Sequence, residues 1–260
     1  MATSPSIFLS HGAPTILTEP SPARQFLTQL GSQIPRPRAV LCVTAHWLTS
    51  TPTLSADPRP ETLYDFGGFP KNLYTLTYPA PGAPDVAEQA ARALRAQNIP
   101  VEITARRGFD HGTWVPLKLI YPEADIQVAQ LSVQPHRSAA WHYQLGQALS
   151  GLLDDNVLIL GSGALTHNLD AWMQGDYASP PGWVTDFTDW VFRAITTGRI
   201  EDLVAYAEKA PHAPDNHPTP EHFLPLFVAL GAAGPDATRT RLHTSIADAV
   251  LSMDAYQFAP

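Results

Sequence analysis

Cysteine and charge are both scarce in this 260-residue sequence. Cys42 is the one cysteine, so no disulfide can form within the chain, and a reducing compartment, the cytoplasm, is expected. Cys42 lies in the apolar run 39–45, which favours a small buried side chain over a nucleophile. The absence of a CxxC pair excludes a structural zinc site built from thiolates.

Charged residues make up 15% of the chain and hydrophobic residues 44%, which favours a compact globule over a disordered chain. Lys and Arg form no runs and the formal net charge is −8, so nucleic acid is not an expected partner. The sequence has no signal-peptide pattern, and no apolar stretch approaches the roughly 20 residues that span a bilayer, so no membrane association is expected. The composition carries no signal for an oligomeric state.

Short apolar runs of strand length alternate with helical patterns. Several runs are continuous, as in strands covered on both faces, and the length suits one large domain. We therefore expect an α/β fold: a single domain over 1–260, with a central, mostly parallel or mixed sheet flanked by helices. The expected strands are 6–10, 40–46, 53–56, 101–104, 126–133 and 157–161, and the expected helices are 84–97, 138–153, 183–195 and 220–230.

Five of the ten histidines stand where a rigid element would hold them. His11, His46 and His167 follow strand-like runs, and His111 lies in a tight turn. His222 is expected in the first turn of the last long helix, with Thr219 as N-cap and Pro220 at the first helical position. Ligands of open α/β sheets bind outside the carboxyl ends of the strands, so we expect these histidines to form one metal or acid/base site.

The residue types at this site narrow the kind of metal. Imidazoles suit Zn, Fe, Cu and Ni, whereas Mg²⁺ and Ca²⁺ prefer oxygen ligands. The histidines therefore predict a catalytic first-row metal with coordination positions left open for a substrate.

Seven short motifs carry a resemblance to a known family. They occur in order and with compatible spacing, and the resemblance runs from Phe8 to about Ser252. Together they resemble the DOPA-dioxygenase-type branch of the class III extradiol ring-cleavage dioxygenases, a superfamily that includes the catalytic subunit of protocatechuate 4,5-dioxygenase. The motifs are Ser10-His-Gly-Ala-Pro14, Thr44-Ala-His-Trp47, Asp65-Phe-Gly-Gly-Phe-Pro70, Tyr78-Pro-Ala-Pro-Gly82, Asp110-His-Gly-Thr-Trp114, Thr166-His-Asn-Leu169 and Pro218-Thr-Pro-Glu-His222.

The resemblance implies an α/β enzyme with one mononuclear divalent metal that cleaves the ring of a small catechol with O₂, giving a muconic semialdehyde. His11 and His46 match the two N-terminal metal ligands of the family, and His222 matches the third. His167 matches the acid/base histidine, which would take a catechol proton and later return it, and it is also a possible fourth ligand. His111 matches a second active-site histidine that would stabilise developing negative charge.

The ligand set leaves the metal open between Zn²⁺ and Fe²⁺. The wider superfamily uses two histidines and one carboxylate, which suits Fe²⁺, whereas a three-histidine set also suits Zn²⁺. Glu221 is an alternative ligand to His222, but adjacent helical side chains point about 100° apart, so both cannot easily bind one ion. A zinc-dependent hydrolase with the same site and a non-catalytic binding protein are the competing functions. The presence of both His167 and His111 favours an enzyme.

Further residues have a structural and a functional interpretation. Asp110 is either a turn or cap residue or a carboxylate that orients a histidine, and Asn168 could act likewise. The segment 65–70 is a candidate lid because of its paired glycines. Among the remaining histidines, His217 is expected nearest the site, and His243 is expected in an edge strand. The aromatic candidates for either the pocket wall or the core are Trp47, Phe66, Phe69 and Trp114.

Overall fold

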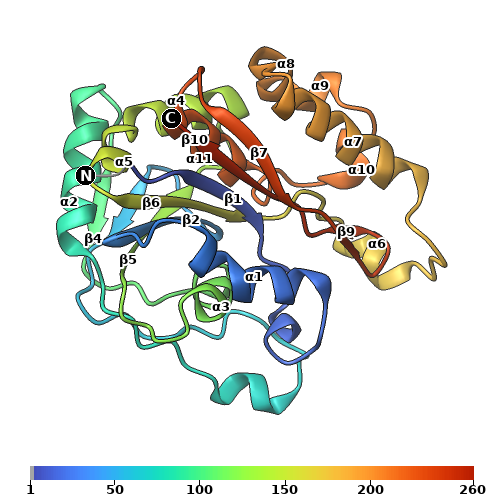
Figure 1. Ribbon diagram of the computed structural model, residues 1–260, viewed down its shortest axis with the longest axis horizontal. Helices are drawn as coiled ribbons and strands as arrows, with labels where there is room; N and C mark the ends of the chain where they lie inside the picture. Colours follow the sequence, from blue (N-terminus) through green and yellow to red (C-terminus); the bar gives the residue numbers. More distant parts are fainter. Residues whose placement is uncertain (1–2) are drawn as a thin grey trace.

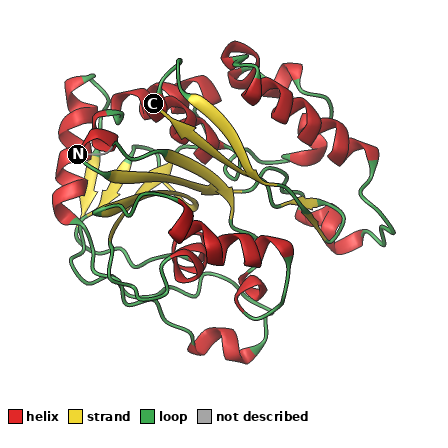
Figure 2. Ribbon diagram, in the orientation of Figure 1, coloured by secondary structure: helices red, strands yellow, loops and turns green. Residues whose placement is uncertain are grey.

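The computed structural model describes residues 3–260, which form a mixed sheet between two layers of helices (Figures 1 and 2). Over these residues the main sheet has eight strands in the order β4-β3-β5-β2-β6-β1-β10-β7. The strands are β1 (Ser6–Ser10), β2 (Ala39–Leu48), β3 (Thr53–Ser55), β4 (Glu102–Thr104), β5 (Gln127–Val133), β6 (Val157–Gly163), β7 (Thr238–His243) and β10 (Ala255–Ala259). This architecture confirms the predicted α/β class.

The four central strands, β5, β2, β6 and β1, run parallel. Strand β10 joins β1 in antiparallel orientation and β7 extends that edge, whereas β3 runs antiparallel to β5 on the other side. A separate short hairpin pairs β8 (Ile246–Ala247) with β9 (Leu251–Ser252). Because parallel neighbours end at the same edge of a sheet, the carboxyl ends of β1, β2 and β6 lie together.

Helices cover both faces of the sheet. Figure 1 shows α1 (Pro22–Gln33) and α3 (His111–Ile120) on one side, and α4 (Ala139–Ala148) and α11 (Leu224–Ala233) on the other. The other helical elements are η1 (Pro14–Leu17), η2 (Lys71–Thr75), α2 (Pro84–Ala96), α5 (Gly151–Asp154), α6 (Leu169–Gln174), α7 (Gly182–Thr196), α8 (Ile200–Val204), α9 (Tyr206–Lys209) and α10 (Ala213–Asn216). Among residues 3–260, no helix has both the length and the apolar character needed to cross a membrane.

The two-sided cover explains the continuous apolar runs. Successive side chains of a strand point to opposite faces, so Ile7 and Leu9 pack in the layer of α1 and α3, while Phe8 packs in the layer of α11. Both faces are buried, so both sets are apolar. Cys42 is fully buried in the first layer, as the packing interpretation predicted, and burial raises the pKa of its thiol.

The six expected strands are present, with ends that differ by two residues at most. The expected helices 84–97 and 183–195 correspond to α2 and α7, and 138–153 divides into α4 and α5. Helices α1 and α3 and strand β10 were not anticipated. His243 ends β7, which is an edge strand as expected.

The expected start of the last helix is wrong. Helix α11 begins at Leu224, and Thr219 does not cap it but donates its hydroxyl to Glu221 Oε1 at 3.0 Å. The carbonyl of His222 accepts the N–H of Ala164 at the end of β6, which draws this residue out of a helical register. The helix then starts so that Pro225 falls in its first turn, where the missing N–H needs no partner.

Candidate metal centre and active site

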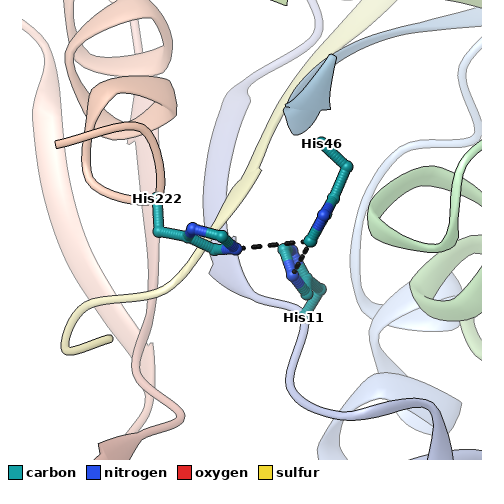
Figure 3. A group of neighbouring side chains, drawn as sticks. All are labelled: His11, His46 and His222. Carbon is teal, nitrogen blue, oxygen red and sulfur yellow. Dashed lines mark hydrogen bonds between the residues drawn. The ribbon is translucent and has the colours of Figure 1, made fainter. Parts of the chain in front are cut away.

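Three histidine side chains that are far apart in the sequence meet at the carboxyl ends of the central strands (Figure 3). His11 directly follows β1, and its N–H donates to the carbonyl of Gly163, the last residue of β6. His46 lies near the end of β2. His222 reaches the same point from the turn before α11.

The three histidines face one another through their Nε2 atoms. His46 Nε2 lies 3.0 Å from His11 Nε2 and 3.3 Å from His222 Nε2. Lone pairs of neutral imidazoles repel at this distance unless a proton or a cation lies between them. Nitrogen ligands about 2.0–2.1 Å from one ion stand roughly 3 Å apart, so the donor set fits a first-row metal.

Burial keeps these imidazoles neutral, which is the form that binds a metal. Burial, together with the neighbouring imidazoles of His46 and His111, holds the pKa of His11 well below its ordinary value of 6.5. Burial is the main cause, and the nearby imidazoles of His167 and His46 the next, of a pKa of His222 that also lies well below 6.5. Burial and the neighbouring His111 lower the pKa of His46 to about 3.

A proline in α3 leaves a carbonyl free for the hydrogen bonds that orient His11. Pro116 has no N–H, so the carbonyl of Gly112 one turn earlier lacks its helical donor. The Ser162 hydroxyl of β6 donates to this carbonyl instead. With its proton used there, Ser162 Oγ accepts from His11 Nδ1 at 3.0 Å, which turns Nε2 toward the other histidines.

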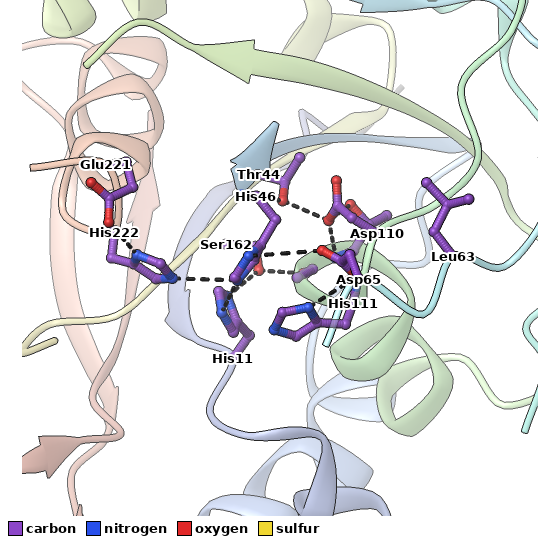
Figure 4. A network of polar contacts seen from close by, with 12 residues as sticks. His11, Thr44, His46, Leu63, Asp65, Asp110, His111, Ser162, Glu221 and His222 are labelled. Atoms are coloured by element: carbon purple, nitrogen blue, oxygen red, sulfur yellow. Dashed lines mark hydrogen bonds and ion pairs between the residues drawn. The ribbon is translucent and has the colours of Figure 1, made fainter. Parts of the chain in front are cut away.

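Two carboxylates lie beside the other site imidazoles (Figure 4). Glu221 Oε1 lies 3.0 Å from His222 Nδ1, so Glu221 stands behind this histidine, on the side away from His46. Asp65 Oδ1 lies 3.0 Å from His111 Nδ1 and accepts the backbone N–H of His111 at 2.8 Å. Asp65 Oδ2 is 3.8 Å from His46 Nδ1. Carboxylates in these positions fix the ring orientation and leave Nε2 for the site.

His111 and His167 lie on two sides of the three-histidine group. The ring of His111, the first residue of α3, is 3.8 Å from that of His46 between centroids, and the ring of His167 stacks on that of His222 at 3.4 Å. The backbone N–H of His167 donates to the carbonyl of Asn216 at 2.9 Å, which anchors its loop. Burial lowers the pKa of His167 to about 4, so the imidazole is neutral near pH 7 and able to accept a proton.

A cavity of about 660 Å³ opens onto these histidines. Phe66 and Phe69 line it as predicted, whereas Trp47 and Trp114 do not. Trp114 is fully buried behind Phe66 and donates its indole N–H to the Leu63 carbonyl, while Trp47 packs under the Arg107 guanidinium. The loop 65–70 forms part of the cavity wall, and its role as a lid stays a prediction. The cavity also has an aromatic residue that the sequence analysis missed, Trp172 of α6.

The two candidate orienting residues serve as helix caps. Asp110 accepts the Thr113 N–H at the start of α3 and bonds Thr44 and Arg107; within residues 3–260 it has no hydrogen bond to a histidine side chain. Asn168 caps α6 by accepting the Ala171 N–H. The N-cap geometry of both uses the side-chain oxygen that would otherwise reach an imidazole.

The sequence analysis did not assign an orienting role to Asp65 or Ser162, although each stands out in its sequence context. Asp65 is the one acidic residue in an aromatic and glycine loop, and Ser162 is the one hydroxyl in an otherwise apolar strand. His217 does not line the cavity: it is buried and its Nε2 donates to the Leu165 carbonyl at 2.8 Å, in the loop that carries His167.

Comparison with known proteins agrees with this geometry. A family model described as the catalytic LigB subunit of aromatic ring-opening dioxygenase matches residues 5–253. The 4,5-DOPA dioxygenase extradiol of Beta vulgaris is 41% identical over 257 residues, which cover 97% of this chain and 96% of the relative. The protein of the same name from Escherichia coli K12 is 40% identical over 88% of this chain and 84% of its own length.

A solved structure shows the same fold. The crystal structure of an uncharacterised protein from Escherichia coli K12 superposes with a TM-score of 0.81 at 36% identity, covering 98% of this chain and 99% of that one. The family implies a metal ion, an aromatic substrate and O₂. The chain thus belongs to the family of the catalytic LigB subunit of aromatic ring-opening dioxygenases, in the branch that contains the 4,5-DOPA extradiol dioxygenases.

Proposed function

We propose that this protein cleaves the ring of a small catechol with O₂ at one mononuclear metal, held by His11, His46 and His222. The observation that carries the proposal is the convergence of three Nε2 atoms, 3.0 and 3.3 Å apart in neighbouring pairs, at a cavity of about 660 Å³. The relatives named for 4,5-DOPA cleavage support a DOPA-like catechol as the substrate.

The proposal assigns Fe²⁺ rather than Zn²⁺ as the working metal. A bound Fe²⁺ would supply a Lewis acid for the diol and a redox partner for O₂, whereas Zn²⁺ has no redox chemistry. The donor set is consistent with either ion, so the choice rests on the reaction of the family.

Two histidines outside the ligand set have proton and charge roles in this proposal. Neutral His167 accepts a proton from the catechol and returns it during ring opening. We place it beside the metal as an acid/base group, because its ring stacks on His222 and its donor atom lies with those of Glu221 and His222, not with those of His11 and His46. His111, with Nδ1 held by Asp65, turns Nε2 to the substrate and stabilises developing negative charge there.

Oxygen uptake by the reconstituted protein tests the activity. The apoprotein is loaded anaerobically with Fe²⁺ or Zn²⁺ and mixed with aerated DOPA, catechol, caffeate or protocatechuate. We expect uptake and a yellow semialdehyde product with Fe²⁺ alone. Absence of both signals across the panel would refute the proposal, and ester or amide hydrolysis retained with Zn²⁺ and abolished with Fe²⁺ would favour the hydrolase.

Metal content tests the ligand assignment. His222→Ala removes one of three nitrogen donors and leaves Glu221 without its imidazole partner. We expect metal affinity to fall by at least about 100-fold, because second-shell changes alone cost about 10- to 100-fold. His136→Ala, outside the site, is the control and should keep full occupancy. Full occupancy in His222→Ala, by elemental analysis after dialysis, would show that the ligand set is wrong.

A further inference from the structure

The cavity over the histidines has no Lys or Arg among the described residues that line it. Among the described residues that line it, the charged ones are Asp65 and Glu221, and the remaining wall is apolar, polar or imidazole. Both carboxylates lie against imidazole Nδ1 atoms at the inner end. Phe69, Leu169 and Trp172 are part of the apolar wall.

A second cavity of about 330 Å³ adjoins the first. The two share the wall residues Gly12, Ala13, Leu251 and Met253. The charged residues that line this second cavity, within residues 3–260, are again acidic: Glu19, next to the end of η1, and Asp248, in the turn between β8 and β9.

One hydrogen bond ties the acidic turn to the wall of the first cavity. Trp172 Nε1 donates to Asp248 Oδ2 at 2.8 Å, so this carboxylate is held beside a residue that lines the first cavity. Figure 1 shows the corresponding elements, α6 and β9, next to each other. The apolar wall of the first cavity therefore borders a carboxylate that lines the second cavity.

Based on the proposed catechol cleavage, we propose that the ring substituent of the substrate carries no net negative charge, as in an alkyl chain, an aminoalkyl chain or the zwitterionic side chain of DOPA. A catechol with a net anionic substituent is selected against. A carboxylate without an ammonium group of its own meets no Lys or Arg among the described residues of the cavity wall and is repelled by Glu19 and Asp248. An ammonium group is instead attracted by the carboxylates of Glu19 and Asp248.

Three catechols of matched shape test the selection. Dopamine, 4-ethylcatechol and 3-(3,4-dihydroxyphenyl)propionate carry a cationic, a neutral and an anionic chain. Two methylene carbons separate the charged group from the ring in dopamine and in the propionate, and the ethyl chain has the same number of carbons without a charge. We expect kcat/KM of the Fe²⁺-loaded protein for dopamine to exceed that for the propionate by about tenfold at low salt, with 4-ethylcatechol between them. The ratio should shrink as KCl is raised to about 0.5 M, because salt screens exposed charges.

Charge variants test the source of the selection. Asp248→Asn keeps an acceptor for Trp172 and suits the positive φ of 48° at this position. Asp248→Asn and Glu19→Gln should each lower the dopamine-to-propionate ratio by about two- to fivefold. Glu88→Gln on α2, at the other end of the molecule, is the matched control and should leave the ratio unchanged.

Equilibrium binding separates this inference from the proposed activity. Calorimetric titration with oxygen excluded measures Kd for the same three catechols and needs no turnover. If no catechol is cleaved but the Kd values keep the expected order, the proposed ring-cleaving activity is wrong and the charge selection stands. Equal or tighter binding of the propionate overturns the selection, and a ratio unchanged in both acidic-site variants overturns its assignment to Glu19 and Asp248.

Discussion

At the residue scale, the site is defined by what stands behind each imidazole. Ser162, Glu221 and Asp65 lie against the Nδ1 atoms of His11, His222 and His111, each at 3.0 Å. An imidazole whose Nδ1–H is held in this way presents the lone pair of Nε2 in a fixed direction. Ring orientation, rather than residue identity alone, thus lets His11 and His222 share a donor set with His46.

The Asp65→Asn variant tests whether the orientation of His111 matters for activity. Asp65 Oδ1 accepts the backbone N–H of His111 and lies 3.0 Å from its Nδ1, and a neutral amide oxygen in its place attracts that imidazole more weakly than a carboxylate does. We expect kcat to fall by about 10- to 100-fold while metal content stays near that of the wild type.

Steady-state kinetics and elemental analysis on the same preparations provide the readout. Asp125→Asn, which removes an exposed carboxylate paired with Arg36, controls for the loss of charge and should keep full activity. An Asp65→Asn enzyme with unchanged kcat would show that His111 needs no orienting carboxylate.

At the scale of elements, close contact between β6 and the turn before α11 sets the position of His222. A Cβ atom added at Gly163 would lie 2.1 Å from the His222 carbonyl oxygen, so only glycine permits this approach. The neighbouring N–H of Ala164 bonds the same carbonyl at 2.9 Å. The strand therefore positions a residue of the candidate metal centre that is more than fifty positions away in the sequence.

Gly163→Ala is expected to displace this turn. The clash is with backbone, which cannot swing aside as a side chain can, so we expect a loss of at least about 2 kcal/mol in the free energy of unfolding, together with weakened metal binding. Denaturant titration and metal titration measure the two effects.

Gly182→Ala is the matched control. A Cβ atom at this first residue of α7 meets nothing within 4 Å, so the variant should be as stable as the wild type or about 0.5–1 kcal/mol more stable. Equal stability of Gly163→Ala and Gly182→Ala would contradict the close-contact argument.

At the scale of the whole molecule, burial of several neutral histidines couples stability to pH. His142, which lies outside the candidate site, shows how a buried histidine is kept neutral. Its Nδ1–H donates to the Ser138 carbonyl at 2.9 Å and its Nε2 accepts the Gln134 N–H at 3.3 Å, so both ring atoms are suited to the neutral form. Burial lowers the pKa of His142 to about 4, and burial has the same effect on His217.

The sign of the pH effect follows from these values. The unfolded chain has histidine pKa values near 6.5, so between about pH 6.5 and 4 the unfolded state binds protons that the folded state does not. The stabilisation is therefore complete above pH 6.5 and is lost as the pH falls toward 4. His142 alone contributes up to about 3 kcal/mol to this loss.

Urea titrations of the metal-free protein from pH 7.5 to 4 measure this effect. The His142→Gln variant should lose less free energy of unfolding over that interval than the wild type, whatever its stability at pH 7.5. Parallel curves for the two proteins would contradict the assignment to His142.

Patterns within short stretches determined most of the fold. Continuous apolar runs gave the central strands, because strands buried on both faces need apolar side chains at every position. The same local reasoning missed α3, whose Pro116 argues against a helix, and placed the start of α11 too early, because the bond from Ala164 to His222 is not visible in either segment alone. The five candidate histidines were found because they follow strands or stand in distinctive motifs.

The α/β class, the histidine set and the family can be recognised in the sequence, because each depends on local periodicity or on motifs in order. The direction in which each imidazole points and the charge of the cavity walls follow from the three-dimensional fold. Ser162 and His11 are 151 positions apart, and Asp248 and Trp172 are 76 apart. Such pairings depend on how strands and turns meet in space, and local sequence patterns do not encode them.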